Sequence, residues 1–509
     1  MNDSIKNRII FFLVAFILVL NLFFKAGWDI WVQTLVHIIS IFIIWSGFCL
    51  SYRISETVRS LPFLLLASGL IISRLFTHTP AVSDADFHNY LNYILIFLTA
   101  ATFFSSDKYR DNAINLILYA GILSSLLDFI YPLVFKTSLY PNPNMKIGFL
   151  LLVFPVFIYK TRQYFLNKNS TFFTLTLAGL ILVLFSFFQA RSGWGAMVLI
   201  FSVLFYLYAA NLWKIDLKWM ILILMAAVIV FILIKPDRLL ARLVWMKCGL
   251  CMFAQQPLAG WGAGSTPHIL PAFMSGKYFS LYIHSFFIQF LAENGLIAFS
   301  GLIWLIAVIL IRIFKSGTDD RNKAVFISLS AVLAYNIFEY NLAIPLIGMA
   351  FWFTAGCFTE QKNISFSFNT KTKNAAFSIL CLIILIFISI KITVPFRVSR
   401  YFAKGMYSIK TKDYITAENL FNSSLNIQPE YPLSRIGLAI ISLRKNELSD
   451  AAENIRAALP PVKNGPAYSA YLKGIFYLDN ENNSYAEIEF IKAVKYIFTQ
   501  HGLDYREYT

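Results

Sequence analysis

Long apolar runs recur along the first 395 residues, and short polar segments separate most of them. Apolar runs of about 17–25 residues are long enough to cross a bilayer as helices. The pattern therefore predicts an all-α, polytopic membrane domain over residues 1–395, with about 12–13 transmembrane helices. The predicted runs cover residues 9–24, 30–51, 60–76, 88–104, 112–131, 145–159, 171–189, 193–211, 219–234, 296–314, 324–341, 343–358 and 375–394.

The last segment, residues 396–509, is polar, has helical periodicity and repeats itself. Small or apolar residues recur in it at intervals of 34 or 35 positions, in the sets Gly405, Ala439 and Gly474; Ala417, Ala451 and Ala486; Phe421, Ile455 and Phe490; and Ser424, Ala458 and Ala493. This spacing resembles the tetratricopeptide repeat, whose paired helices stack into a small α-solenoid. Lys404 departs from the leucine position of that pattern, so the array is degenerate. The resemblance implies a protein-binding surface, and a packing cap over the membrane domain remains the alternative.

Charge patterning predicts the orientation of the helices. The chain carries a formal net charge of +16. Its basic residues gather in alternate short loops, so topology explains the charge better than a nucleic-acid partner does. With the N-terminus in the cytoplasm, the inward segments hold 18 Lys and Arg residues, whereas the short outward loops hold only Lys25, Lys136 and Arg191. We therefore expect a membrane protein with a cytoplasmic N-terminus, a retained first helix and a C-terminal domain on the outer side of the membrane.

One outward loop, residues 235–283, breaks this charge rule because it holds five basic residues. Within it, Arg238 and Arg242 are one helical turn apart and Trp245 follows three residues later, which predicts that all three share one helix face. The segment "PLAGWGAGS" then supplies glycines that allow close backbone approach to a ligand. His284 follows and opens a short amphipathic helix that ends at Glu293-Asn294-Gly295.

Several other polar residues have simpler interpretations. Asn336 and Glu339 share one face of a predicted spanning helix, and Glu339 is either functional or solvated at the helix end. Asp84, Asp86 and His88 form an acidic cluster that we interpret as a solvated loop. His268 has no neighbouring landmark. Of the five cysteines, Cys248 and Cys251 form a single CxxC without a second ligand pair, so neither a metal site nor a cofactor is expected.

The motifs together resemble the O-antigen ligase and polymerase superfamily. The resemblance rests on the turn "ARSGWG" around Arg191, then Arg242-x-x-Trp245, then "PLAGWGAGS", then His284 with "IQFLAENGL" after it. It spans roughly residues 140–360. It implies a metal-independent membrane glycosyltransferase that works at the periplasmic face of the bacterial inner membrane, which would place the outward C-terminal domain in the periplasm. The donor is a glycan on undecaprenyl diphosphate, and the acceptor is lipid A–core, another lipid-linked glycan or a protein.

The chemistry of such a transfer assigns roles to the charged residues. The leaving diphosphate needs fixed cations, and arginine is always charged and grips two oxygens at once. We therefore expect Arg191, Arg238 and Arg242 to bind the donor diphosphate. His284 is the candidate base for the acceptor hydroxyl, because its ordinary pKa of about 6.5 suits proton abstraction near neutrality. Arg242 and His284 are the catalytic candidates, with Glu339 as an additional one.

Alternatives stay open at this stage. Within the superfamily, an O-antigen ligase is the first interpretation and a polymerase of O-antigen or exopolysaccharide is the alternative, because an outward repeat domain favours slightly an enzyme that does more than extend a chain. From a different class, a lipid-linked-sugar flippase or secondary transporter would also have many helices and buried arginines. Transporters tend to show repeated, interrupted helices near the middle of the membrane, and no such pairing is visible in the sequence. A protein partner bound through residues 397–509 is a further expectation.

Overall fold

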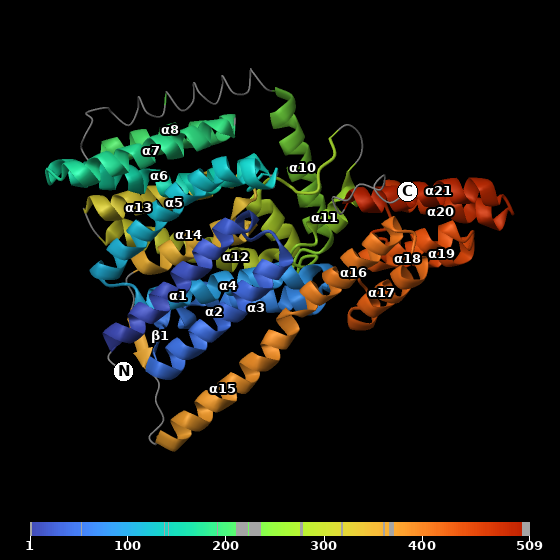
Figure 1. The fold of residues 1–509 in the computed structure, drawn as a ribbon, viewed down its shortest axis with the longest axis horizontal. Coiled ribbons are helices and arrows are strands. Elements are labelled where there is room, and N and C mark those ends of the chain that lie inside the picture. The colour runs from blue at the N-terminus through green and yellow to red at the C-terminus, as the bar shows by residue number, and fades with distance from the viewer. Residues whose placement is uncertain are drawn as a thin grey trace.

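The protein is mostly helical in the computed structural model (Figure 1). The structure describes residues 3–51, 53–136, 138–140, 142–190, 192–209, 222, 236–274, 278–316, 319–359, 362–365 and 371–500. Within the membrane domain the helices are α1 Asp3–Phe23, α2 Ile30–Ser51, α3 Leu61–Phe76, α4 Pro80–Phe103, α5 Asp107–Phe135, α6 Pro143–Leu166, α7 Ser170–Gln189, α8 Gly193–Ala209, α10 Pro236–Gln255, α11 Thr266–Ile269, α12 Phe286–Lys315, α13 Asp320–Tyr335, α14 Pro345–Phe358 and α15 Lys371–Ile392.

Short elements complete the membrane domain. Four 3₁₀ turns occur, namely η1 Lys25–Gly27, η2 Glu56–Arg59, η3 Leu270–Phe273 and η4 Asn341–Ala343. Strands β1 Arg53–Ser55 and β2 Asn363–Ser365 pair in an antiparallel ladder, with Ile54 opposite Ile364.

Many of the helices are apolar enough to span a membrane. Seven segments meet the length and composition of a spanning helix, and three more apolar helices, in α3, α8 and α14, are shorter. The seven segments are Ile5–Phe23, Ile30–Gly47, Asp107–Phe135, Pro143–Leu166, Ser170–Gln189, Phe286–Lys315 and Ala375–Lys410. A helix covers all or most of each predicted run except 219–234, which lies outside the described residues apart from Leu222. These helices agree with a multi-pass membrane protein.

Two local expectations were wrong. The run predicted as one helix over 324–341 ends at Tyr335, because Asn336 caps α13 and the chain then turns. The acidic cluster of Asp84, Asp86 and His88 lies in the first three turns of α4 rather than in a loop. Pro80 at the first position of α4 starts the helix earlier than hydropathy indicates, since proline is well suited to a first helical turn.

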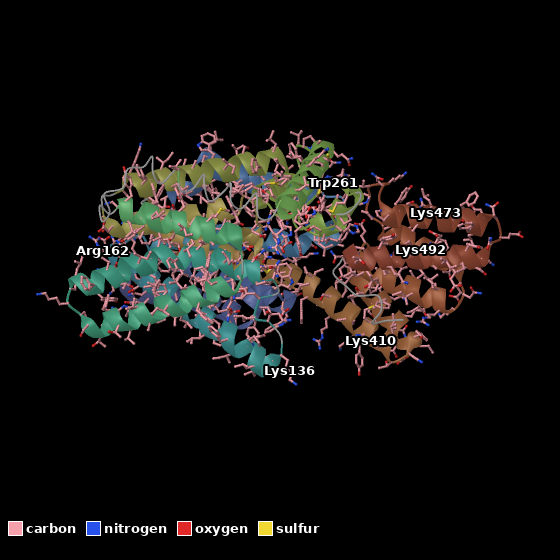
Figure 2. The ribbon with its side chains drawn as sticks, turned by 90° about the horizontal axis from the view of Figure 1, so that it is seen from above. Lys136, Arg162, Trp261, Lys410, Lys473 and Lys492 are labelled. Atoms are coloured by element: carbon pink, nitrogen blue, oxygen red, sulfur yellow. The ribbon has the colours of Figure 1, made fainter. Side chains whose placement is uncertain are left out.

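The polar segments gather at two opposite ends of the helical bundle. At one end Arg321 pairs with Asp107 at 2.6 Å and with Asp111 at 3.4 Å, and Arg162 pairs with Asp320. Strands β1 and β2 pair at the same end. All these segments belong to the set predicted to face the cytoplasm. Figure 2 shows Arg162 at this end and Trp261 near the other, beside the C-terminal helices.

Close helix contacts hold the bundle together. A Cβ atom added at Gly69 of α3 would lie 2.3 Å from the backbone nitrogen of Ala298 in α12. One added at Gly301 would lie 2.2 Å from the backbone nitrogen of Leu66. Small residues let α3 and α12 approach this closely, which is how helices associate in lipid, where burial of apolar area favours no particular contact.

The C-terminal helices have a separate hydrophobic core. They form the pairs α16 Val394–Lys410 with α17 Tyr414–Ile427, α18 Pro432–Arg444 with α19 Leu448–Ala458, and α20 Pro466–Asp479 with α21 Asn483–Gln500. Figure 1 shows them beside one end of the bundle, beyond α15. Gly405 faces the ring of Phe421 and Gly474 faces the ring of Phe490, where an added Cβ would lie at 2.5 and 2.4 Å. The repeated small and aromatic positions thus make the same contact in the first and third pairs.

Candidate functional site

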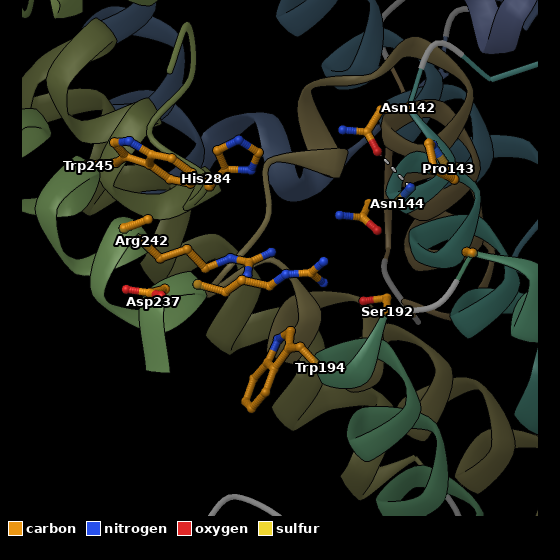
Figure 3. A pocket seen from close by; sticks show the side chains of 12 residues that line it. Asn142, Pro143, Asn144, Ser192, Trp194, Asp237, Arg242, Trp245 and His284 are labelled. Carbon is orange, nitrogen blue, oxygen red and sulfur yellow. Dashed lines mark hydrogen bonds between the residues drawn. The ribbon is translucent and has the colours of Figure 1, made fainter. Parts of the chain in front are cut away.

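An open cavity of about 490 Å³ lies at the end of the bundle next to the C-terminal helices (Figure 3). Helix α10, the start of α6, the α7–α8 turn and the segment before α12 supply its walls. Figure 3 shows Arg242, Trp245 and His284 on one side, with Asn142, Asn144 and Ser192 opposite them. The lining residues are Asn142, Pro143, Asn144, Ala190, Ser192, Trp194, Asp237, Arg238, Ala241, Arg242, Trp245 and His284. Its volume falls within the range of small-ligand sites, about 300–1,000 Å³.

A buried carboxylate, Glu339, organises one wall of this pocket. Its side chain is 1 % exposed, so the interpretation of Glu339 as a solvated helix end was wrong. Oε1 accepts hydrogen bonds from Arg242 Nη2 at 2.5 Å and from Asn144 Nδ2 at 3.1 Å. Oε2 lies 3.2 Å from His284 Nδ1. One carboxylate therefore joins three segments that are far apart in the chain, and a buried charge of this kind is retained only when it is paired.

The break between α13 and α14 is what brings Glu339 into the wall. Asn336 Nδ2 donates to Val332 O at 2.8 Å, and its Oδ1 accepts from the backbone N–H of Leu342 at 2.9 Å. The carbonyls of Asn336 and Glu339 accept from the N–H of Phe286 at 3.0 and 2.8 Å. These bonds satisfy irregular backbone that is buried in protein, which is the condition for interrupting a helix at membrane depth.

His284 is held in a fixed orientation directly before α12. Its φ of +52° lies in the left-handed region, where a non-glycine residue stores strain, and such strain is often found at functional sites. The Trp245 ring lies over its imidazole at 4.7 Å between centroids, and Tyr340 meets it edge-on at 5.5 Å. Because the carboxylate of Glu339 is an acceptor, Nδ1 carries the proton in the neutral ring. Nε2 makes no hydrogen bond among the described residues and remains available as an acceptor.

The arginines predicted to bind an anion differ in the hydrogen bonds and ion pairs that they make. Arg242 donates from Nε to Phe338 O at 3.1 Å as well as to Glu339, and its side chain is 13 % exposed. Arg238, one turn earlier on α10, is exposed and has no ion pair or hydrogen bond with the residues that the structure describes. Arg191 lies outside the described residues, although Ala190 and Ser192 on either side of it line the pocket. Arg238 therefore has no partner among the described residues, whereas Glu339 and the carbonyl of Phe338 hold Arg242 in place.

The structure adds residues that the sequence motifs did not single out. Asn142 caps α6, accepting from the N–H of Asn144 at 2.9 Å, and both asparagines line the pocket. An asparagine before a helix-starting proline is a helix-start signal, so the sequence predicts the cap without predicting a site. Tyr282 stacks on Tyr340 at 4.3 Å behind His284. Burial, reinforced by the charges of Asp86 and Glu293, raises the pKa of Tyr282, which keeps its hydroxyl neutral.

Other polar candidates lie away from the pocket. His268 is buried in α11 and does not line the cavity. Asp84 pairs with Arg74 at 2.6 Å, and Asp86 accepts from Asn89 at 3.0 Å. Among the described residues, no group of three or more His, Cys, Asp or Glu side chains could hold a metal ion.

Comparison with known proteins leaves the chain unassigned. No protein-family model, no curated protein and no solved structure matches it.

Proposed function

We propose that the protein transfers a glycan from a lipid-linked diphosphate donor to an acceptor hydroxyl at the periplasmic face of the inner membrane. The observation that carries the proposal is the carboxylate of Glu339, which fixes Arg242 and His284 within one wall of the pocket. Arg238, which has no partner among the described residues, lines the same pocket. The resemblance of these motifs to O-antigen ligases and polymerases gives the same reaction class.

The side chains divide the reaction between them. The acceptor oxygen attacks the anomeric carbon and forms the new glycosidic bond, while the bond from that carbon to the diphosphate breaks. His284 Nε2 takes the hydroxyl proton, and Glu339 stabilises the imidazolium through Nδ1. The electron pair of the broken bond leaves with the diphosphate. The permanently charged guanidinium groups of Arg238 and Arg242 stabilise the negative charge of the leaving diphosphate. The transfer therefore needs no metal ion.

The predicted topology supports a periplasmic pocket. The segments rich in Lys and Arg lie at the opposite end of the bundle, among the ion pairs of Arg162 and Arg321. Basic loops favour the cytoplasm. The pocket and the C-terminal helices would then share the outer face, where lipid-linked glycans are assembled into longer products.

Replacing His284 tests the proposal. The variant His284→Ala should lower transfer by about 10²–10⁴-fold, the usual contribution of a general base. The measurement is glycan transfer from a lipid-linked donor by purified protein in detergent, with loss of donor and gain of product followed separately. His268→Ala is the matched control, because that histidine is buried outside the pocket. Full activity in His284→Ala would refute the assignment.

We further propose that the C-terminal helix pairs form a degenerate tetratricopeptide-like array that positions the acceptor or a partner protein. Its support is the repeated packing of glycine on phenylalanine in the first and third pairs. Deleting residues 397–509 should reduce transfer to the natural acceptor more than transfer to a small soluble acceptor. Equal activity toward both acceptors after the deletion would remove the recruiting role and favour the packing cap.

A further inference from the structure

A second pocket lies at the opposite end of the bundle from the candidate site. It has a volume of about 290 Å³ and lies between the η2 turn, the last three turns of α12 and strand β2. Its lining residues are Glu56, Thr57, Arg59, Ser60, Leu305, Val308, Ile309, Arg312 and Ile364. The β1–β2 ladder and the ion pairs of Arg321 mark this end as the one predicted to face the cytoplasm.

Two arginines face this pocket without a carboxylate partner. Neither Arg59 nor Arg312 forms an ion pair or a side-chain hydrogen bond with any residue that the structure describes. Glu56 also lines the pocket, yet it forms no salt bridge with either guanidinium. Two other arginines at this end, Arg321 and Arg162, are neutralised by aspartates. Arg59 and Arg312 therefore leave a local excess of positive charge beside a concave surface.

Along α12, the residues that line this pocket change from apolar to cationic. Leu305, Val308 or Ile309, and Arg312 recur at helical spacing and so share one face of α12. With a rise of 1.5 Å per residue, the guanidinium-bearing turn lies about 10 Å beyond Leu305 along the helix axis. Phe286–Lys315 is among the segments apolar enough to span a membrane, and Arg312 is in its last turn. This arrangement matches a lipid, with an acyl chain beside the leucine and a phosphate beside the arginines.

We propose that this pocket binds the headgroup of an anionic phospholipid from the cytoplasmic leaflet. Arginine suits a phosphodiester because its planar fork donates to two oxygens at once. Anionic lipids concentrate in that leaflet, and basic pockets between helices on that side bind lipid headgroups. The pocket would anchor α12, whose other end begins two residues after His284. The inference depends on the membrane orientation and not on glycosyl transfer.

Native mass spectrometry of the delipidated full-length protein tests the proposal. Phosphatidylglycerol is titrated against wild type and the double variant Arg59→Gln/Arg312→Gln. The double variant should require about tenfold or more lipid for the same occupancy, because two charge-assisted contacts are lost. The control is Lys108→Gln/Lys315→Gln, which removes the same charge from residues that do not line the pocket.

Three results would overturn the proposal. The control variant could lose as much binding as the pocket variant, which would reduce the effect to general surface charge. Phosphatidylcholine could bind as tightly as phosphatidylglycerol, which would remove the selection for net negative charge. Inorganic phosphate at millimolar concentration could displace the lipid completely, which would make free phosphate the ligand. Retained glycosyl transfer in the double variant would separate this pocket from the catalytic one.

Discussion

The pocket of the membrane domain and the core of the C-terminal helices are built in opposite ways. The pocket wall joins polar side chains from segments up to 195 residues apart, as the hydrogen bond from Asn144 to Glu339 shows. The C-terminal core instead repeats one local contact, with Gly405 on Phe421 and Gly474 on Phe490. One region depends on a few buried charges, and the other depends on the fit of small residues against rings.

This difference predicts different responses to mutation. In the pocket, Glu339 stabilises a positive charge and orients a histidine, so its removal disturbs several segments at once. In the C-terminal helices each contact belongs to one repeat, and stability is close to a sum over neighbouring units. Damage to the pocket should therefore be concerted, whereas damage to the C-terminal helices should stay local.

The largest expected effect is that of Glu339→Ala. Removing one partner of a buried ion pair leaves an uncompensated charge and typically costs about 3–5 kcal/mol of stability. We expect loss of transfer together with a lower thermal midpoint of the full-length protein. Glu418→Ala is the control, because Glu418 pairs with Lys445 on the exposed surface of the C-terminal helices. A normal midpoint and normal transfer in Glu339→Ala would show that the carboxylate does not organise the pocket.

A smaller effect is expected for Gly474→Val. The added Cβ would lie 2.4 Å from Phe490, so the ring has to move, and overpacking of this kind costs roughly 1–3 kcal/mol. Limited proteolysis of the full-length protein should release the C-terminal helices sooner, with transfer to a small acceptor unchanged. Lys473→Val places the same side chain on the exposed neighbouring position. Faster proteolysis of that control would assign the effect to helix propensity instead.

The smallest expected effect is that of Arg238→Gln. This side chain is exposed, and an exposed ion pair contributes about 0.2–1 kcal/mol, so we expect up to about a fivefold rise in KM for the donor. The rise should shrink as ionic strength increases, because salt screens exposed charges. Lys247→Gln, also exposed on α10 but outside the pocket, should leave KM unchanged. An equal change in both variants would indicate only a general attraction to the donor.

The sequence alone predicted much of the helical architecture, because hydropathy and charge act locally along the chain. Apolar length located twelve of the described helices, and Arg238, Arg242 and Trp245 share a face of α10 as their spacing indicates. The sequence also predicted the break in the helix near Glu293-Asn294-Gly295, where Gly295 has a φ of +74°. It erred where capping overrode hydropathy, at Asn336 and at Pro80.

Only the tertiary structure decided which charges meet. Spacing could not show that Glu339 contacts both Arg242 and His284, or that Asn142 and Asn144 face them across a cavity, since these contacts depend on the packing of separate helices. It also could not distinguish a paired arginine from an unpaired one, as the contrast between Arg321 and Arg312 shows. Periodicity reports the side of a helix that is apolar, whereas a site is defined by the neighbours that this side acquires on folding.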